Sequence, residues 1–269
     1  MTVCIAAICR DDGEDKIVCC TDKKLSSALG SVETGFKDLP IAHRWRLLTA
    51  GDEAEIIALH RLYQQRFEDI NNLTAEKLDE SMMLPPRQRK INLSDEYTFS
   101  RYNMSYADFI KVGRDSFPDE EFRNSIRNVA AIRLRASLIV AGFVDGMAEI
   151  YYTDEDATAR AANDYAVTGE GEYVARSVLL RREQYSRLPL HKTLYNVYEA
   201  KRYSETIGSV GEETTISILS SRKKRELTSV AVDEQLEEYY VKYGPKALPQ
   251  DFALKGPILY SEEKSERNE

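Results

Sequence analysis

Two apolar runs near the N-terminus predict a β-hairpin. They cover Val3–Cys9 and Ile17–Thr21, and the turn residues Asp11-Asp12-Gly13 lie between them. Aspartate and glycine favour tight hairpin turns because they tolerate a positive φ. A weaker pair follows, with a polar run around Ser31–Phe36 and an apolar run over Trp45–Ala50. We therefore expect the chain to open with four strands.

After Gly51 the apolar residues recur at steps of three and four, which is typical of a helix. Four of them fall on one face: Ile56, Leu59, Tyr63 and Phe67. Residues from about 73 to 116 show the weakest periodicity, and Met83-Leu84-Pro85-Pro86-Arg87 interrupts what there is. We expect an irregular insertion or extended lid here, and not a separate domain.

The later part of the chain alternates between helical and strand patterns. Helices are expected from Pro118 onward, from Glu172 to about Arg182, around Leu190–Val197 and over Asp233–Tyr243. Strands are expected over Ser137–Phe143, Ala148–Thr153, Tyr165–Val167, Thr214–Leu219 and Leu227–Val232. Strand groups separated by helix pairs favour two packed sheets with helices outside them. We expect a single domain over residues 1–269, with a flexible tail from about Ser261.

The composition is that of an ordinary globular protein, with 42% hydrophobic and 30% charged residues among 269. The net charge of −8 argues against a dedicated surface for nucleic acid or for anionic membranes. No apolar stretch approaches the roughly 18 residues that span a bilayer, and the N-terminus does not have the pattern of a signal peptide. We expect a cytoplasmic protein without a membrane or nucleic-acid partner.

The cysteines and histidines do not predict a metal site. Cys4, Cys9, Cys19 and Cys20 fall in the first two apolar runs without a Cys-x-x-Cys pair, so we expect small buried side chains. The histidines are scattered without ligand spacing. We expect neither a metal nor a cofactor.

The candidate chemistry begins at Thr2. Removal of Met1 would leave a hydroxyl and a free α-amine on one residue, which is a nucleophile with its own base. The α-amine has an ordinary pKa of about 7.7–8.0, which suits a base near neutral pH. Asp22 ends the second apolar run, Lys37 follows it, and Ala50-Gly51-Asp52 leads from a strand into a helix. None of these residues alone indicates a catalytic site. The occurrence of all of them in this order is what suggests one.

This order of elements and residues resembles the proteasome-type N-terminal nucleophile hydrolases. The opening Met-Thr-x-Cys-hydrophobic-Ala is similar to that of the bacterial proteasome-like Anbu proteins. The resemblance covers most of the chain, apart from residues 73–116 and the tail after about 243. It implies an α+β fold, the four-layer αββα sandwich, with the first residue of the mature chain in a cleft between the sheets.

The resemblance assigns a catalytic role to four residues. Thr2 matches the nucleophile, Asp22 the buried acid, Lys37 the strand lysine and Gly51 the oxyanion-hole glycine. Lys37 is then expected to lower the pKa of the Thr2 hydroxyl and to relay its proton, while the Gly51 N–H stabilises the tetrahedral oxyanion.

Three further residues are possible supporting partners at positions where the chain departs from the family. Glu170 stands inside Gly169-Glu170-Gly171, where active members commonly have serine. Glu205 matches an aspartate position, and Ser209 or Gly208 matches a serine position. We expect Gly169-Glu170-Gly171 to form a helix-entry turn. A nucleotide loop is the weaker interpretation, because the third glycine of that fingerprint is missing.

The sequence thus predicts a threonine-type hydrolase or peptidase that cleaves amide bonds through an acyl-enzyme on Thr2. The resemblance also implies self-assembly into a homo-oligomeric ring or stack, and it leaves open whether an unfoldase partner exists. Two alternatives stay open. One is a catalytically inactive scaffold subunit that retains Met1, and the other is a small-molecule amidase of the same fold, with the 73–116 insertion closing its pocket.

Overall fold

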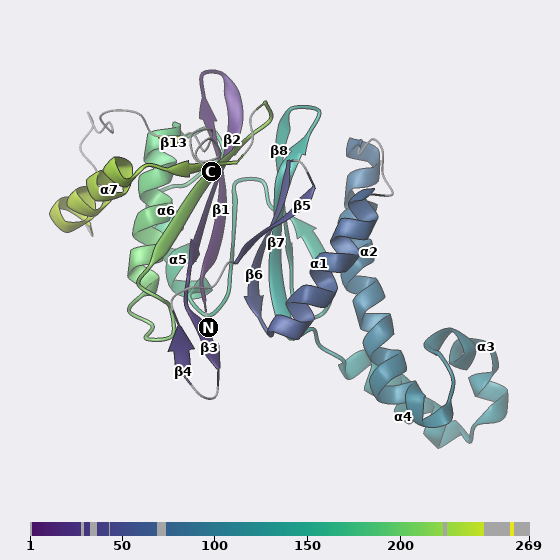
Figure 1. Ribbon diagram of the computed structural model, residues 1–269. Coiled ribbons are helices and arrows are strands. Elements are labelled where there is room, and N and C mark those ends of the chain that lie inside the picture. The colour runs from purple at the N-terminus through teal and green to yellow at the C-terminus, as the bar shows by residue number, and fades with distance from the viewer. Residues whose placement is uncertain are drawn as a thin grey trace, which may run out of the picture.

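The computed structural model describes residues 2–27, 30–32, 37–42, 44–68, 74–222, 225–244 and 259–260. In this part of the chain the fold is mixed α and β and contains two large antiparallel sheets (Figure 1). The strands are β1 (Cys4–Asp11), β2 (Glu14–Asp22), β3 (Leu25–Ser27), β4 (Gly30–Val32), β5 (Asp38–Ala42), β6 (Trp45–Gly51), β7 (Ala136–Val144), β8 (Met147–Thr153), β9 (Ala159–Ala161), β10 (Tyr165–Thr168), β11 (Thr214–Ser220), β12 (Glu226–Thr228) and β13 (Leu259–Tyr260). The helices are α1 (Glu53–Glu68), α2 (Ala75–Ser94), the π-helix η1 (Asp95–Phe99), the 3₁₀ helix η2 (Ser100–Tyr102), α3 (Tyr106–Ser116), α4 (Asp119–Ala131), α5 (Glu172–Arg181), α6 (Leu190–Ser204) and α7 (Val230–Tyr243).

The first sheet has the strand order β10-β1-β2-β11-β12-β13. The predicted N-terminal hairpin is confirmed: β1 and β2 pair from Cys4 opposite Thr21 to Asp11 opposite Glu14. Its turn uses Asp12 and Gly13 at φ values of 51° and 80°, as the Asp-Gly signal predicts. The second sheet has the order β5-β6-β7-β8-β9. The predicted strands Ser137–Phe143 and Ala148–Thr153 are confirmed as β7 and β8, which pair as a hairpin.

Both faces of β1 are buried, which explains why the opening run is continuously apolar. Val3, Ile5 and Ala7 pack in one cluster with residues of α5 and α6. Cys4 and Ala6, on the opposite face, pack in a cluster with side chains of β6 and β7 from the second sheet. The two sheets therefore face each other across an apolar interior.

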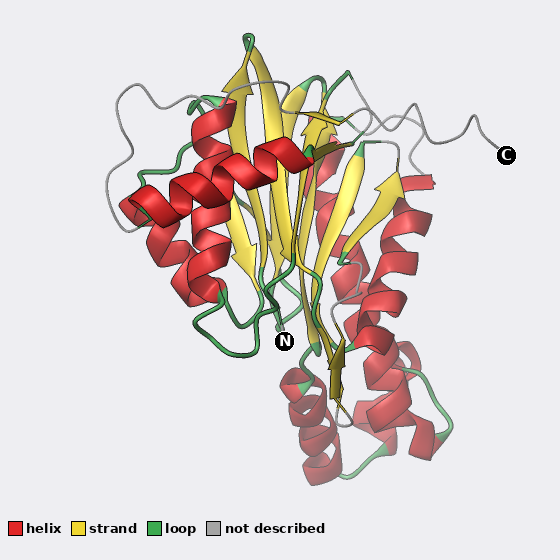
Figure 2. Ribbon diagram, turned by 60° about the vertical axis from the view of Figure 1, so that its left-hand side comes forward, coloured by secondary structure: helices red, strands yellow, loops and turns green. Residues whose placement is uncertain are grey.

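Helices cover the outer faces of both sheets (Figure 2). On the first sheet, α6 contacts β1 and β2, and α5 contacts β10. On the second, α1 contacts β5, β6 and β7. The helical stripe predicted for α1 is confirmed, because Leu59, Tyr63 and Phe67 are buried there and Ile56 is partly buried against the same cluster.

The expected irregularity of 73–116 is wrong, because α2, η1, η2 and α3 make residues 75–116 mostly helical. That the segment is an insertion or a lid stays a prediction. Pro85 and Pro86 lie inside α2 without ending it. Pro86 has no N–H for the Met82 carbonyl, and the Tyr63 hydroxyl of α1 donates to that carbonyl at 3.1 Å instead. This hydrogen bond from α1 replaces the one that Pro86 cannot donate, so α2 continues through a sequence that locally predicts its end. Together with α4, α3 projects from the far end of α2 (Figure 1).

The predicted strand Leu227–Val232 is wrong in its second half. β12 ends at Thr228, and Val230 already belongs to α7. The cause is Ser229, whose hydroxyl accepts from the Val232 N–H and caps the helix. The strand β5 was missed, since Pro40 and a register shift interrupt its pairing with β6.

Two expectations reach beyond the described residues. Of the polar run Ser31–Phe36, the first two residues belong to β4, and 33–36 lie outside the described part. The tail 261–269 lies outside it entirely. No helix in the described ranges is both long and apolar enough to cross a membrane.

Candidate active site

The structure brings together three of the four principal site residues in one buried cluster. The Lys37 Nζ lies 2.5 Å from the Thr2 Oγ1 and 2.9 Å from the Asp22 Oδ1. The Thr2 hydroxyl also hydrogen-bonds to the Asp22 Oδ1. All three side chains are buried, with exposed fractions of 3% for Thr2, 0% for Asp22 and 6% for Lys37. An alcohol, a carboxylate and an ammonium thus form a triangle shielded from solvent.

Strand pairing places Asp22 beside Thr2. The pairing of Cys4 with Thr21 sets Asp22, the last residue of β2, opposite the start of the chain. The Asp22 N–H donates to the Val3 carbonyl at 3.4 Å, and the Val3 N–H donates to the Asp22 Oδ1 at 3.0 Å. The hairpin register therefore determines which acid faces the candidate nucleophile.

The buried Asp22 carboxylate is surrounded by donors. Its second oxygen accepts from the Gly211 N–H at 3.0 Å and from the Lys24 N–H at 3.3 Å. A buried charge is tolerated only when it is paired and hydrogen-bonded, and here Lys37 supplies the opposite charge. The sequence did not predict this role for Gly211, because the donor is its backbone N–H and glycine has no side chain that indicates it. It lies three residues before β11, whose Thr214 pairs with Asp22.

Lys37 is held where the chain enters β5. Its carbonyl accepts from the Thr49 N–H at 2.9 Å, so this residue is tied to β6 of the second sheet. Asp22 ends β2 of the first sheet, and Thr2 lies two residues before β1 of the same sheet. The cluster therefore joins the two sheets, and each contributes at least one of its side chains.

Gly51 ends β6 in a conformation that favours glycine. Its φ is +122°, and a Cβ at this position would lie 2.3 Å from the Arg135 carbonyl oxygen. Only a residue without a side chain fits without strain. The next residue, Asp52, donates its N–H to the same carbonyl at 2.8 Å, which turns the chain into α1.

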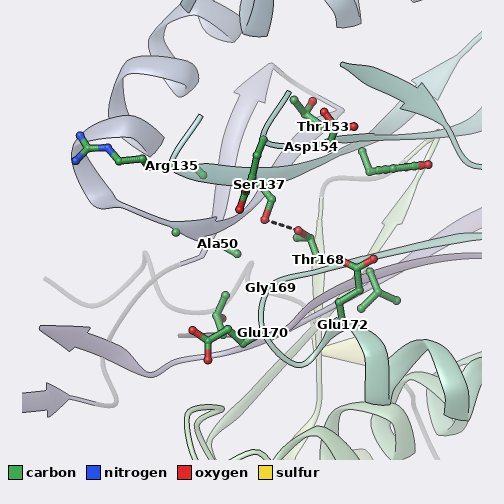
Figure 3. Close-up of a pocket in the computed structure, with 15 residues that line it drawn as sticks. Ala50, Arg135, Ser137, Thr153, Asp154, Thr168, Gly169, Glu170 and Glu172 are labelled. Atoms are coloured by element: carbon green, nitrogen blue, oxygen red, sulfur yellow. Dashed lines mark hydrogen bonds between the residues drawn. The ribbon is translucent and has the colours of Figure 1, made fainter. Parts of the chain in front are cut away.

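Thr2 and Gly51 both line a cavity of about 600 Å³. Figure 3 shows the side chains around it. Asp22 and Lys37 do not line it, so Thr2 stands between the cavity and the buried charges. The lining residues come from the ends of β6 and β10, from β7, β8 and their flanking turns, and from the entry to α5: Thr2, Ala50, Gly51, Arg135, Ala136, Ser137, Tyr152, Thr153, Asp154, Glu155, Val167, Thr168, Gly169, Glu170 and Glu172. A small substrate group could enter beside the hydroxyl.

The turn between β10 and α5 packs directly on Thr2. The Gly171 N–H donates to the Thr2 carbonyl at 3.2 Å, and a Cβ on Gly169 would lie 2.4 Å from the same oxygen. Gly171 is the N-cap of α5, which confirms the expected helix-entry turn. Glu170, between the two glycines, is exposed and lines the cavity. No described hydrogen bond joins its carboxylate to Thr2.

Glu205 and Ser209 do not line the cavity. Glu205 forms ion pairs with the buried Lys201 and with Arg202 on the side of α6. The hydroxyl of Ser209 is buried and has no hydrogen-bond partner within the described residues. It lies two positions before Gly211, so this segment supports Asp22 through its backbone.

The four cysteines are buried thiols in strands, as expected. Burial raises the pKa of the Cys4 and Cys9 thiols to about 12. Such thiols stay protonated near neutral pH and are poor nucleophiles. Thr168 donates to the Ser137 hydroxyl at 2.6 Å on the cavity wall, a contact between two strands that the sequence did not predict.

No protein-family model matches the chain, and the comparison with curated proteins found no significant match.

Proposed function

We propose that the protein is a threonine-type hydrolase that cleaves amide bonds through an acyl-enzyme on Thr2, exposed by removal of Met1. The observation that carries the proposal is the contact of the Thr2 hydroxyl with both Asp22 and Lys37 at the edge of a cavity. We further propose that the fold is the four-layer αββα sandwich of the N-terminal nucleophile hydrolases. Helices on the outer faces of two packed sheets support this assignment.

The proposed reaction begins with attack of the Thr2 Oγ1 on the carbonyl carbon of the substrate. The hydroxyl proton passes to the α-amine of the processed Thr2, which is the general base. The C–N bond of the tetrahedral intermediate then breaks, and the amine leaves with that proton. Water attacks the resulting ester, and its hydrolysis releases the acid and restores the hydroxyl.

Each partner has a distinct task in this scheme. The Lys37 ammonium stabilises negative charge on the Thr2 oxygen as the proton leaves, and Asp22 holds the ammonium in place. The Gly51 N–H, at the end of β6 on the wall of the cavity that Thr2 also lines, is the proposed donor to the oxyanion. Removing one such donor typically costs about 10²–10³ in turnover.

The substrate is proposed to be a peptide, and the chain is proposed to assemble with copies of itself. Exposed apolar side chains on the projecting helices support self-assembly, with Ile110 52% and Val112 47% exposed on α3. The cavity volume of about 600 Å³ is also compatible with a small-molecule amidase.

The test compares turnover of fluorogenic peptides and small acylated amines by the processed wild type, Thr2→Ala and Thr2→Ser. Thr2→Ala is expected to lower turnover at least about 10³-fold, whereas Thr2→Ser keeps a hydroxyl and retains part of it. The preferred panel distinguishes a peptidase from an amidase. Wild-type turnover in Thr2→Ala contradicts the proposal, because the nucleophile must then be another residue. No turnover by a processed wild type also contradicts it and favours a scaffold.

A further inference from the structure

The cavity beside Thr2 is lined by more acidic than basic side chains. Four carboxylates line it, those of Asp154, Glu155, Glu170 and Glu172, against the single guanidinium of Arg135. A cleft lined by one sign of charge concentrates its field and attracts ligands of opposite charge. The ion pairs of these residues decide how much of that charge is free to act on a ligand.

Two of the four carboxylates already have cationic partners. Asp154 lies 3.5 Å from Arg160, and Glu172 lies 2.8 Å from Arg176 on the first turns of α5. Arg135 lies 3.8 Å from Asp52, and its side chain extends away from the other labelled side chains in Figure 3. These pairs contribute little net charge to the cavity.

Glu155 and Glu170 have no ion pair among the described residues. Glu170 is the better placed of the two, because the glycines on both sides of it contact the Thr2 carbonyl. Its carboxylate therefore belongs to the same turn that packs on the candidate nucleophile. Glu155 follows β8, and its carbonyl accepts from the Leu134 N–H at 2.7 Å, which fixes its backbone at the edge of the cavity.

We propose that Glu155 and Glu170 select substrates with a positive charge next to the amide bond that Thr2 attacks. The chemical class is an acyl group that bears an ammonium or guanidinium, as lysine and arginine residues do. This inference rests on the proposed function, since it concerns the same site. Both carboxylates are reached by solvent, so each contributes a modest and salt-sensitive preference.

The test uses three peptide epoxyketones that differ only at the residue next to the reactive group: lysine, its neutral isostere norleucine, and glutamate. The rate of adduct formation on the processed protein is followed by intact mass. We expect lysine to react about tenfold faster than norleucine, and glutamate to react slowest. Raising the salt concentration to about 1 M shortens the Debye length to about 3 Å and should reduce the preference.

Variants then assign the preference to these carboxylates. Glu155→Gln with Glu170→Gln is expected to reduce the lysine-to-norleucine ratio to about one. Glu238→Gln, which removes an exposed carboxylate on α7 outside the cavity, is the matched control and should keep the wild-type ratio. Equal rates for the three reagents in the wild type, or an unchanged ratio in the double variant, overturn the charge selection and leave Thr2 as the nucleophile. Absence of any adduct on Thr2 overturns both proposals.

Discussion

At the scale of single residues, the buried Asp22–Lys37 ion pair contributes to the stability of the fold and is also part of the proposed catalytic site. Both side chains are buried, and Lys37 is the cationic partner of Asp22 among the described residues. Removing one member of a buried pair leaves a charge without compensation and typically costs about 3–5 kcal/mol.

We therefore predict strong coupling in a double-mutant cycle. Asp22→Asn and Lys37→Met should each destabilise the fold by about 3 kcal/mol, and the double variant by clearly less than the sum. Urea denaturation of the four proteins measures this coupling. Additive effects within about 0.5 kcal/mol would show that the two side chains do not interact.

Gly51 allows a matched test of backbone strain. Gly51→Ala introduces a Cβ into contact with the Arg135 carbonyl at φ +122°, and we predict a loss of about 2 kcal/mol or more. Gly146→Ala is the control, because Gly146 also has a positive φ of +84° but open space around its Cβ position. Its cost should be about 1 kcal/mol. Equal unfolding free energies for the two variants would refute the close approach at Gly51.

The buried thiols predict a pH dependence of stability. Their pKa values are raised to about 12 for Cys4 and Cys9, while in the unfolded chain a thiol titrates near 8.5. The unfolded state therefore loses thiol protons first as the pH rises. The free energy of unfolding should fall above about pH 9, by roughly 1 kcal/mol per thiol and pH unit. Urea denaturation at pH 8 and pH 10 measures this fall in the free energy of unfolding. In Cys9→Ala the fall should be smaller by the contribution of one thiol.

At the scale of elements, α6 positions the segment that supports Asp22. Lys201 is fully buried, forms an ion pair with Glu205 and donates to the Glu212 carbonyl at 2.5 Å. It thereby holds both ends of the segment that presents the Gly211 N–H to Asp22. Glu205 thus helps to hold this segment through its ion pair with Lys201, and it does not line the cavity.

We predict that Lys201→Met loosens that segment. The Gly211 amide should then exchange its hydrogen at least about tenfold faster, because the loosened segment no longer holds this N–H opposite its acceptor, the Asp22 carboxylate. Lys192→Met, at a partly buried position on the same helix, is the control. Native-state hydrogen exchange measures both. Unchanged protection at Gly211 in Lys201→Met would remove Lys201 from this role.

The sequence predicted those elements that are marked by neighbouring residues, such as a turn dipeptide or a periodic run of apolar side chains. The Asp-Gly turn and alternating burial identify the first hairpin, and the stripe of α1 identifies its buried face. The helices of 73–116 escaped because they pack against several different partners: α2 against α1, and α3 against both η1 and α4. Phe109 contacts Phe99 at 4.6 Å and Phe122 at 5.0 Å between ring centres, and these contacts do not follow one continuous stripe.

At the scale of the whole molecule, the candidate site is assembled from segments of both sheets. Thr2 and Asp22 come from the first sheet, and Lys37 and Gly51 adjoin strands of the second. The resemblance predicted this set of four. The Gly211 donor and the acidic lining of the cavity escaped prediction, because they arise from chain segments that only the folded structure brings together.

The most direct measurement is peptide mapping of the N-terminal fragment after reaction with a hydroxyl-directed β-lactone. We expect a fragment that begins at Thr2 and carries the acyl group on that residue. A fragment that begins at Met1 in every molecule, or an adduct confined to other residues, would contradict the proposal that the alcohol and amine of Thr2 act together.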